Sequence, residues 1–162
     1  MTSERDGFSG LLWLCVPVYG LHIMEELAFG WLDWAQSVGM MFPGWSTFYV
    51  TNAVVIVIGV TAAALGWRMP ACALAFPALM VINALLFHLL PSLTGGRPNP
   101  GCISAMVFFL PIAALTLRDA WRAGVRAWQT YAAAALIAGV LQLWPVLLLK
   151  LSPLLAAGPA QR

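Results

Sequence analysis

The sequence predicts an all-α fold: a single membrane-embedded domain over residues 1–162, built as a bundle of five transmembrane helices. The chain is 62% hydrophobic and 9% charged, whereas soluble domains are roughly 45–50% apolar and about 25% charged. Five apolar stretches are each long enough to cross about 30 Å of hydrocarbon in helical form. The expected spans cover about residues 9–30, 47–67, 71–90, 101–117 and 127–151.

Charge and cysteine content exclude several classes of partner and site. A formal net charge of +2 with scattered basic residues argues against nucleic acid. Cys15, Cys72 and Cys102 are odd in number and lack CxxC spacing, which favours small apolar fillers over disulfides or a zinc site. Glu4 and Asp6 make the N-terminus a poor signal peptide, so we expect the first span to be retained.

The basic residues near the span ends predict the orientation. With an odd number of spans the termini lie on opposite sides, and more basic residues fall on the N-terminal side than on the other. The N-terminal side carries Arg5, Arg68, Arg118, Arg122 and Arg126, and the other side carries Arg97, Lys150 and Arg162. We therefore expect a cytoplasmic N-terminus.

The motif His22-Ile23-Met24-Glu25-Glu26 lies inside the first predicted span. Each ionised group near a bilayer centre costs at least about 2.5–3.5 kcal/mol. Helical spacing places His22, Glu25 and Glu26 on one face. The alternatives are a polar seam that holds helices together and a functional site, and an intramembrane ionisable group favours the second.

Two chemistries suit these side chains. Two carboxylates this close do not both ionise easily in a low dielectric, so one stays protonated as a general acid or both bind a cation. With His88, the residues His22, Glu25 and Glu26 would form a two-His, two-carboxylate site suited to Zn, Fe or Mn. The alternative for His88 is an interfacial residue with its tip in water.

The uncommon polar side chains of the other spans fall at a similar depth. The half of the membrane far from the N-terminus is predicted to hold Thr51, Asn52, Asn83, His88, Asn99 and Gln142. This convergence predicts one polar cavity near the non-cytoplasmic face. Asn83 either makes a hydrogen bond between helices or donates a hydrogen bond in the site.

Aromatic residues flank the predicted spans. The chain has eight tryptophans, mostly at span ends, where they are typical interfacial anchors. Trp31 and Trp34 follow the HxxEE helix closely, and we expect them to line the substrate cavity with Asn52. An indole face there would stabilise a cation.

Two loop features have simpler interpretations. Asp33 lies seven residues after Glu26 and is interpreted as a solvated residue in the connection. Asn99, Pro100 and Gly101 are typical of a helix start, with Asn99 as the N-cap and proline in the first turn.

The order of three pieces resembles a known family. These are His22-Ile23-Met24-Glu25-Glu26, then Asn83-Ala84 followed by His88, then Pro100-Gly101. The chain resembles the HXXEE domain proteins, small bacterial integral membrane proteins, over residues 20–105. That family carries the HxxEE motif, a second histidine and a Tyr-x-Pro-Gly motif in this order, and Pro98 stands here at the tyrosine position. The resemblance implies a bacterial inner membrane protein and names no substrate.

A looser similarity links the chain to five-span sterol isomerases of the emopamil-binding type. Those enzymes combine intramembrane His, Glu, Asn and Trp to protonate an alkene. The same residue types occur here, but no sequence motif matches, so the similarity is an analogy. An analogy of fold does not establish function.

The leading hypothesis is a membrane-embedded isomerase or cyclase that acts on a lipophilic substrate by proton transfer without a cofactor. Glu25 or Glu26 would donate the proton, His22 and His88 would set protonation states, and Asn83 would orient them. The alternatives are a metal-dependent enzyme using the His/Glu cluster, and a non-enzymatic carrier or scaffold. Membrane lipid is an expected partner, and an oligomer is compatible with the sequence.

Two geometric expectations follow from the single-site hypothesis. One of the two glutamates, Glu25 or Glu26, should approach His88 within direct or one-water hydrogen-bond reach. The two glutamates should also be inequivalent, one facing the centre and the other held by a supporting partner.

Overall fold

The structure is a computed structural model that describes residues 9–39 and 44–156, with side chains described through residue 145. The described residues form helices joined by turns, which confirms the all-α class. The helices are α1 (Gly10–Ala28), α2 (Trp31–Ser37), α3 (Trp45–Leu65), η1 (Gly66–Arg68), α4 (Pro70–Ile82), η2 (Asn83–Leu89), α5 (Leu90–Gly95), α6 (Cys102–Ser104), η3 (Ala105–Phe109), α7 (Leu110–Arg122) and α8 (Trp128–Ala156).

Within these described residues, four stretches of helix are long and apolar enough to cross a membrane. They are Gly10–Ala28, Trp45–Arg68, Pro70–Gly95 and Cys102–Arg122. These match the first four predicted spans, with the third and fourth running about five residues further than the apolar stretch predicted. The fifth predicted stretch is helical as α8, but its role as a span stays a prediction. The orienting residues Arg5 and Arg162 lie outside the described residues.

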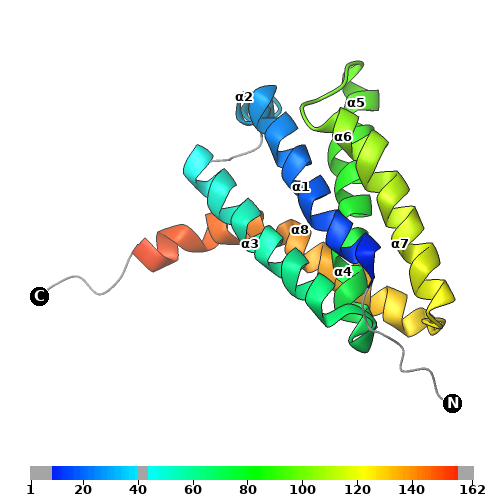
Figure 1. Ribbon diagram of the computed structural model, residues 1–162. Helices are drawn as coiled ribbons and strands as arrows, with labels where there is room; N and C mark the ends of the chain where they lie inside the picture. Colours follow the sequence, from blue (N-terminus) through cyan, green and yellow to red (C-terminus); the bar gives the residue numbers. More distant parts are fainter. Residues whose placement is uncertain (1–8, 40–43, 157–162) are drawn as a thin grey trace, which may run out of the picture.

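The four long helical stretches run up and down, and α8 crosses them obliquely (Figure 1). Helix α1 packs against α3, α4 and α7, and α4 packs against α3, α7 and α8. The short helices α2, α5 and α6 gather at one end of the bundle, and the α3–α4 turn and α7–α8 loop lie at the other (Figure 1). The two ends of the bundle therefore differ in structure.

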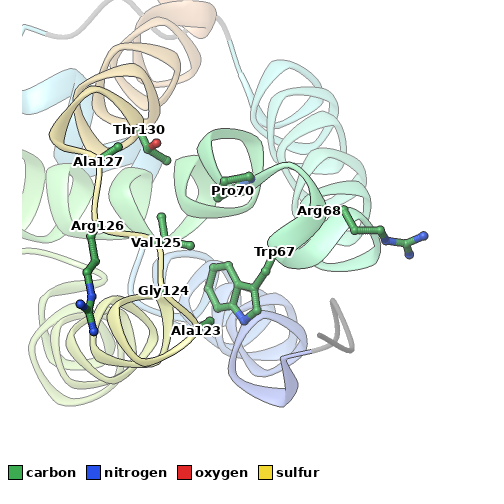
Figure 2. Close-up of a pocket in the computed structure, with 9 residues that line it drawn as sticks. All are labelled: Trp67, Arg68, Pro70, Ala123, Gly124, Val125, Arg126, Ala127 and Thr130. Atoms are coloured by element: carbon green, nitrogen blue, oxygen red, sulfur yellow. The ribbon is translucent and has the colours of Figure 1, made fainter. Parts of the chain in front are cut away.

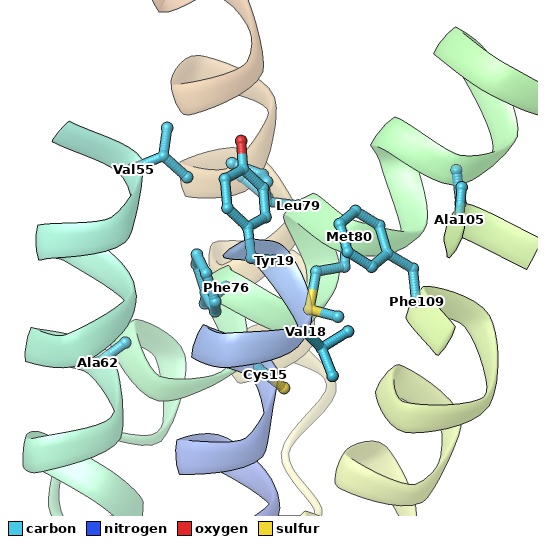
Figure 3. Close-up of a cluster of buried hydrophobic side chains, with 12 residues drawn as sticks. Cys15, Val18, Tyr19, Val55, Ala62, Phe76, Leu79, Met80, Ala105 and Phe109 are labelled. Carbon is cyan, nitrogen blue, oxygen red and sulfur yellow. The ribbon is translucent and has the colours of Figure 1, made fainter. Parts of the chain in front are cut away.

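The centre of the bundle is an aromatic and aliphatic cluster around Tyr19 of α1 (Figure 3). The Tyr19 ring stacks on Phe109 at 5.8 Å between centroids and is tilted against Phe76 at 5.5 Å. Gly59 and Ala62 of α3 are buried on the side facing this cluster. Small residues let helices approach closely where packing rather than hydrophobic burial holds them, as in a membrane.

Two π-helical segments interrupt the long helices, and the sequence did not predict them. Segment η2 spans Asn83–Leu89, and η3 spans Ala105–Phe109. Each is followed within a few residues by a proline, Pro91 or Pro111, in the first turn of the next helix. A proline removes a backbone donor from the helix before it. Single-turn π segments rotate the following side chains and frequently lie at functional sites.

The connection between the first two spans was predicted as a loop, and this was wrong for its first half. Residues Trp31–Ser37 form helix α2, because Leu32 and Ala35 are buried and give this short stretch an inner face. Asp33 is exposed, as the solvated interpretation expected, but it lies on this helix.

Replacing Gly59 with alanine should destabilise the bundle. A Cβ atom at Gly59 would lie 2.6 Å from the Phe76 ring, so α3 and α4 would have to separate. Overpacking of this kind costs about 1–3 kcal/mol. The matched control is Gly20→Ala in α1, where a Cβ atom meets nothing within 4 Å. Thermal unfolding in detergent should show a lower melting temperature for Gly59→Ala only, and equal behaviour of the two variants would contradict this packing.

Candidate functional site

Three buried side chains from two separate segments converge near the end of α1. His22 and Glu26 lie one helical turn apart on α1, and His88 comes from η2. Glu26 Oε1 lies 3.5 Å from His22 Nε2 and 3.5 Å from His88 Nε2. The exposed fractions of the three residues are 1%, 6% and 0%. The predicted approach of a glutamate to His88 is confirmed, and Glu26 is that glutamate.

The surroundings of this His22–Glu26–His88 cluster are largely apolar. The two imidazole rings meet edge to face at 4.7 Å between centroids. The Phe109 ring lies 4.4 Å from that of His22, and Tyr19 lies 6.2 Å from it. Charges in such a weakly polarisable site interact strongly, so the positions of protons and ions decide its stability.

The other nitrogen of His88 is held by Asn99. His88 Nδ1 lies 3.1 Å from Asn99 Oδ1, and Asn99 Nδ2 donates to the carbonyl of Phe87 at 2.8 Å. Since Pro91 has no N–H, the Phe87 carbonyl lacks its ordinary helical donor four residues on, and the asparagine amide replaces it. That bond fixes the orientation of the amide. Because Oδ1 can only accept, His88 Nδ1 carries the hydrogen and donates.

The other nitrogen of His22 is held in the same way by Ser104. The Ser104 hydroxyl donates to the Gly101 carbonyl at 3.3 Å, and its oxygen lies 2.9 Å from His22 Nδ1. With the single Ser104 hydrogen directed to Gly101, the serine oxygen accepts from His22 and the Nδ1 atom carries the ring hydrogen. Both histidines are thereby set in the same tautomer.

This hydrogen bonding leaves three acceptors facing one point. In neutral rings with hydrogen on Nδ1, both Nε2 atoms present lone pairs, and both are buried without a hydrogen-bond partner. They face the same carboxylate oxygen of Glu26. Acceptors opposed in a dry site repel one another, so a positive charge or a proton must lie between them.

The three side chains could hold a divalent metal ion. One donor atom from each of the three residues lies within 4.8 Å of the others. Two donors bound tetrahedrally at about 2.1 Å stand about 3.4 Å apart, close to the 3.5 Å found here. Two imidazoles and one carboxylate suit Zn, Fe or Mn. Metal-ligating histidines characteristically donate the N–H of their second ring nitrogen to a protein acceptor, and the Nδ1 atoms of His22 and His88 lie within hydrogen-bond distance of such acceptors.

Glu25 was predicted as part of this cluster, and its carboxylate lies elsewhere. It accepts the backbone N–H of Ile103 at 3.1 Å and that of Ser104 at 2.7 Å, where the helical stretch of α6, η3 and α7 begins. Glu25 therefore anchors α6 to α1 and positions the serine that holds His22. The predicted inequivalence of the two glutamates is confirmed, with Glu26 facing the centre and Glu25 held by a supporting partner.

The remaining predicted residues lie outside the cluster. Asn83 makes no hydrogen bond with the cluster, and its Oδ1 is buried without a partner. Asn52 accepts from the Tyr19 hydroxyl at 2.9 Å and belongs to the core between α1 and α3. The Trp31 ring packs against Phe48 at 5.5 Å, and Trp34 lies half-buried on α2. Their role in lining a substrate cavity stays a prediction.

Sequence reasoning missed Ser104, and it placed Asn99 near the cavity but with the wrong role. The predicted N-cap role of Asn99 was wrong: helix α6 begins after Gly101 without a side-chain cap, and the Asn99 side chain binds His88 instead. Pro91 was the available signal, because the carbonyl four residues before a proline needs another donor. No comparable signal marks Ser104, which reaches His22 through the packing of α6 on α1.

Gly101 closes one side of the cluster. Its φ of +90° favours glycine. A Cβ atom at this position would lie 2.5 Å from His88 Cε1, 2.8 Å from His22 Cε1 and 2.9 Å from Glu26 Cγ. The loop backbone can approach the three side chains this closely only without a side chain of its own.

A family model described as "protein of unknown function with HXXEE motif" matches residues 13–116, well over half of the chain. The chain belongs to the HXXEE family. No curated protein matches it, and no solved structure does. The family match contains the whole cluster with Asn99, Gly101 and Ser104, and it ends before α8. In this HXXEE protein the two glutamates of the motif have separate structural positions.

The two glutamates should respond differently to amide replacement. Glu25→Gln keeps one acceptor oxygen for two backbone donors and should lose about 1 kcal/mol of stability. Glu26→Gln should leave stability unchanged or raise it, because the new amide N–H can donate to an unpaired Nε2. Thermal unfolding of chelator-treated protein measures both. Equal losses at the two positions would contradict this division.

Replacing Gly101 with alanine should cost more stability than backbone strain alone explains, because the new Cβ atom also displaces the side chains of the cluster. The matched control is Gly96→Ala, because Gly96 also has a positive φ, +69°, but a Cβ atom there meets nothing within 4 Å. Left-handed strain costs about 1–2 kcal/mol in either variant. Gly101→Ala should cost at least about 1 kcal/mol more, since three side chains must move. Chemical or thermal unfolding of both variants tests the difference.

Proposed function

We propose that this chain is a membrane-embedded metal-dependent enzyme in which His22, Glu26 and His88 hold a divalent cation and act on a lipophilic substrate. The observation that supports this is the arrangement of acceptors. Two Nε2 atoms without hydrogen-bond partners face one carboxylate oxygen at 3.5 Å, and both rings are fixed through Nδ1. A cation satisfies all three groups at once.

Three protein donors favour a catalytic over a structural ion. Structural zinc sites are closed by four protein ligands, whereas catalytic sites keep a position for water or substrate. Glu25, the nearest further carboxylate in sequence, is engaged by two backbone N–H groups. The cation would supply a Lewis acid, while Ser104 and Asn99 hold the ligand rings and Phe109 limits the access of water.

The surroundings support a lipophilic substrate. Apolar side chains are exposed on several helices, among them Val57, Leu86 and Val107, at 65%, 56% and 55%. Such faces suit hydrocarbon rather than water. The cluster itself lies against the aromatic rings of Tyr19 and Phe109. A substrate that reaches it meets mainly apolar walls and one polar centre.

Proton transfer by an isomerase or cyclase is the second candidate. Its supporting observation is the equal distance of Glu26 Oε1 from both Nε2 atoms, which would place one acidic proton between two bases. Glu26 would then be the general acid, and His22 and His88 would set its charge. A single proton satisfies only one of the two histidines, so the metal-dependent reaction accounts for more of the geometry.

The membrane arrangement that accompanies this proposal has five spans, with α8 as the fifth. The bacterial inner membrane and a cytoplasmic N-terminus are part of the same proposal. The orientation rests on the arginines near the span ends and the fifth span on the apolar sequence of α8, while the bacterial inner membrane is what the family resemblance implies. The cluster would then lie toward the non-cytoplasmic face.

Purified protein should contain stoichiometric Zn, Fe or Mn. His22→Ala, His88→Ala and Glu26→Gln should each remove it, because each deletes one of three ligands. The measurement is elemental analysis by mass spectrometry on monodisperse protein in detergent, after incubation with each metal and removal of excess.

Two control variants separate ligands from other residues. Asp33→Asn removes an exposed carboxylate and should leave the metal content unchanged. Glu25→Gln should retain metal with weaker affinity, because it only positions Ser104. Metal-free wild type that still converts a lipophilic substrate would favour proton transfer by Glu26. Wild-type protein without metal or turnover would overturn both candidates.

A further inference from the structure

A cavity of about 430 Å³ lies between the α3–α4 turn and the α7–α8 loop (Figure 2), at the end of the bundle away from α2, α5 and α6 (Figure 1). It reaches the first turn of α8. Its walls come from Trp67, Arg68, Pro70, Ala123, Gly124, Val125, Arg126, Ala127 and Thr130. The cavity shares no residue with the proposed metal centre.

The polar lining of this cavity is basic. Arg68 and Arg126 line it from opposite sides, both are exposed, and their guanidinium groups point outward from its rim (Figure 2). The Arg126 guanidinium lies 5.5 Å from the ring of Trp121, and Arg68 reaches the Ala64 carbonyl at 3.5 Å. Neither arginine pairs with a carboxylate within the described residues, and no acidic residue lines the cavity.

Other residues at the same end of the bundle add to the positive charge of the cavity lining. Arg118 and Arg122 lie on the last turns of α7. The nearby carboxylate, Asp119, accepts a hydrogen bond from Ser9. Two arginines of the cavity and two of α7 thus belong to the elements of this end, where Asp119 already has a partner. The ligand that complements this surface carries negative charge.

The position of the cavity and its apolar walls restrict the class of ligand further. The cavity lies where two membrane-length helices meet at the α3–α4 turn and a third, α7, ends. If these helices span a membrane, that level is the headgroup region, where indole rings such as Trp67 are typical. Pro70 and Val125 supply apolar walls beside the arginines. An anion with an attached apolar chain matches both features.

We propose that this cavity binds the headgroup of an anionic phospholipid between Arg68 and Arg126. Basic pockets between transmembrane helices are established sites for such headgroups. The lipid would join the α3–α4 turn to Thr130 in the first turn of α8. It would therefore stabilise the position of α8, the helix that crosses the bundle obliquely (Figure 1).

Delipidated full-length protein titrated with phosphatidylglycerol or phosphatidylcholine tests this proposal by native mass spectrometry and melting temperature. Phosphatidylglycerol should bind tighter and raise the melting temperature. Each arginine near a charged headgroup contributes about fivefold in affinity. Arg68→Gln with Arg126→Gln should therefore weaken phosphatidylglycerol binding by about 25-fold. If the double variant misfolds, Arg68→Gln alone should lose about fivefold.

The control is Arg97→Gln, which removes an exposed arginine at the other end of the bundle and should bind phosphatidylglycerol like wild type. Equal binding of the two lipids, or an equal loss in Arg97→Gln, would overturn the site. Inorganic phosphate that raises the melting temperature as much as phosphatidylglycerol would overturn the lipid as its ligand. Metal content should not change in the arginine variants, so this result is independent of the proposed function.

Discussion

The opposition of three hydrogen-bond acceptors at the end of α1 is the constraint on which the local structure depends. His22, His88 and Glu26 bring two unpaired Nε2 atoms against one carboxylate oxygen, which is unfavourable unless a proton or a cation lies between them. The two imidazoles are held by hydrogen bonds on their far sides, which their Nδ1 atoms make with Ser104 and Asn99. The favourable folding energy of the rest of the bundle thus offsets the repulsion within the cluster. Such a local loss of stability is typical of functional sites.

The loop between η2 and α6 completes the cluster through backbone chemistry. Pro91, in the first turn of α5, has no N–H to donate to the Phe87 carbonyl. The Asn99 side-chain amide donates to that carbonyl instead, and its oxygen orients His88. Two residues later the chain turns at Gly101, where only glycine allows the backbone to lie against both imidazoles. Glu25 then fixes the start of α6. One short segment therefore supplies a hydrogen-bond partner for His88, a closing wall for the cluster and an anchored helix start.

Sequence reasoning predicted the helices and the cluster better than the contacts that hold it. Apolar stretches define helices because length and composition suffice, and the four-residue spacing of His22 and Glu26 places them on one face. The predicted membrane depth of His88, similar to that of the HxxEE motif, predicted its approach to a glutamate. The π segment η2 could not be predicted, since the loss of one backbone donor at Pro91 can be met in several ways. Ser104 depends on how α6 packs against α1, which no local pattern encodes.

The geometry of an α-helix explains why the two glutamates of the motif separate. At 3.6 residues per turn, Glu25 lies about 60° to one side of His22, and Glu26 about 40° to the other. Helix α1 contacts α4 and α6, which belong to different parts of the bundle. The glutamate on the side of η2 meets His88, and the glutamate on the side of α6 meets backbone N–H groups. Adjacent glutamates on a helix between two neighbours can therefore complete a site and anchor the loop that closes it.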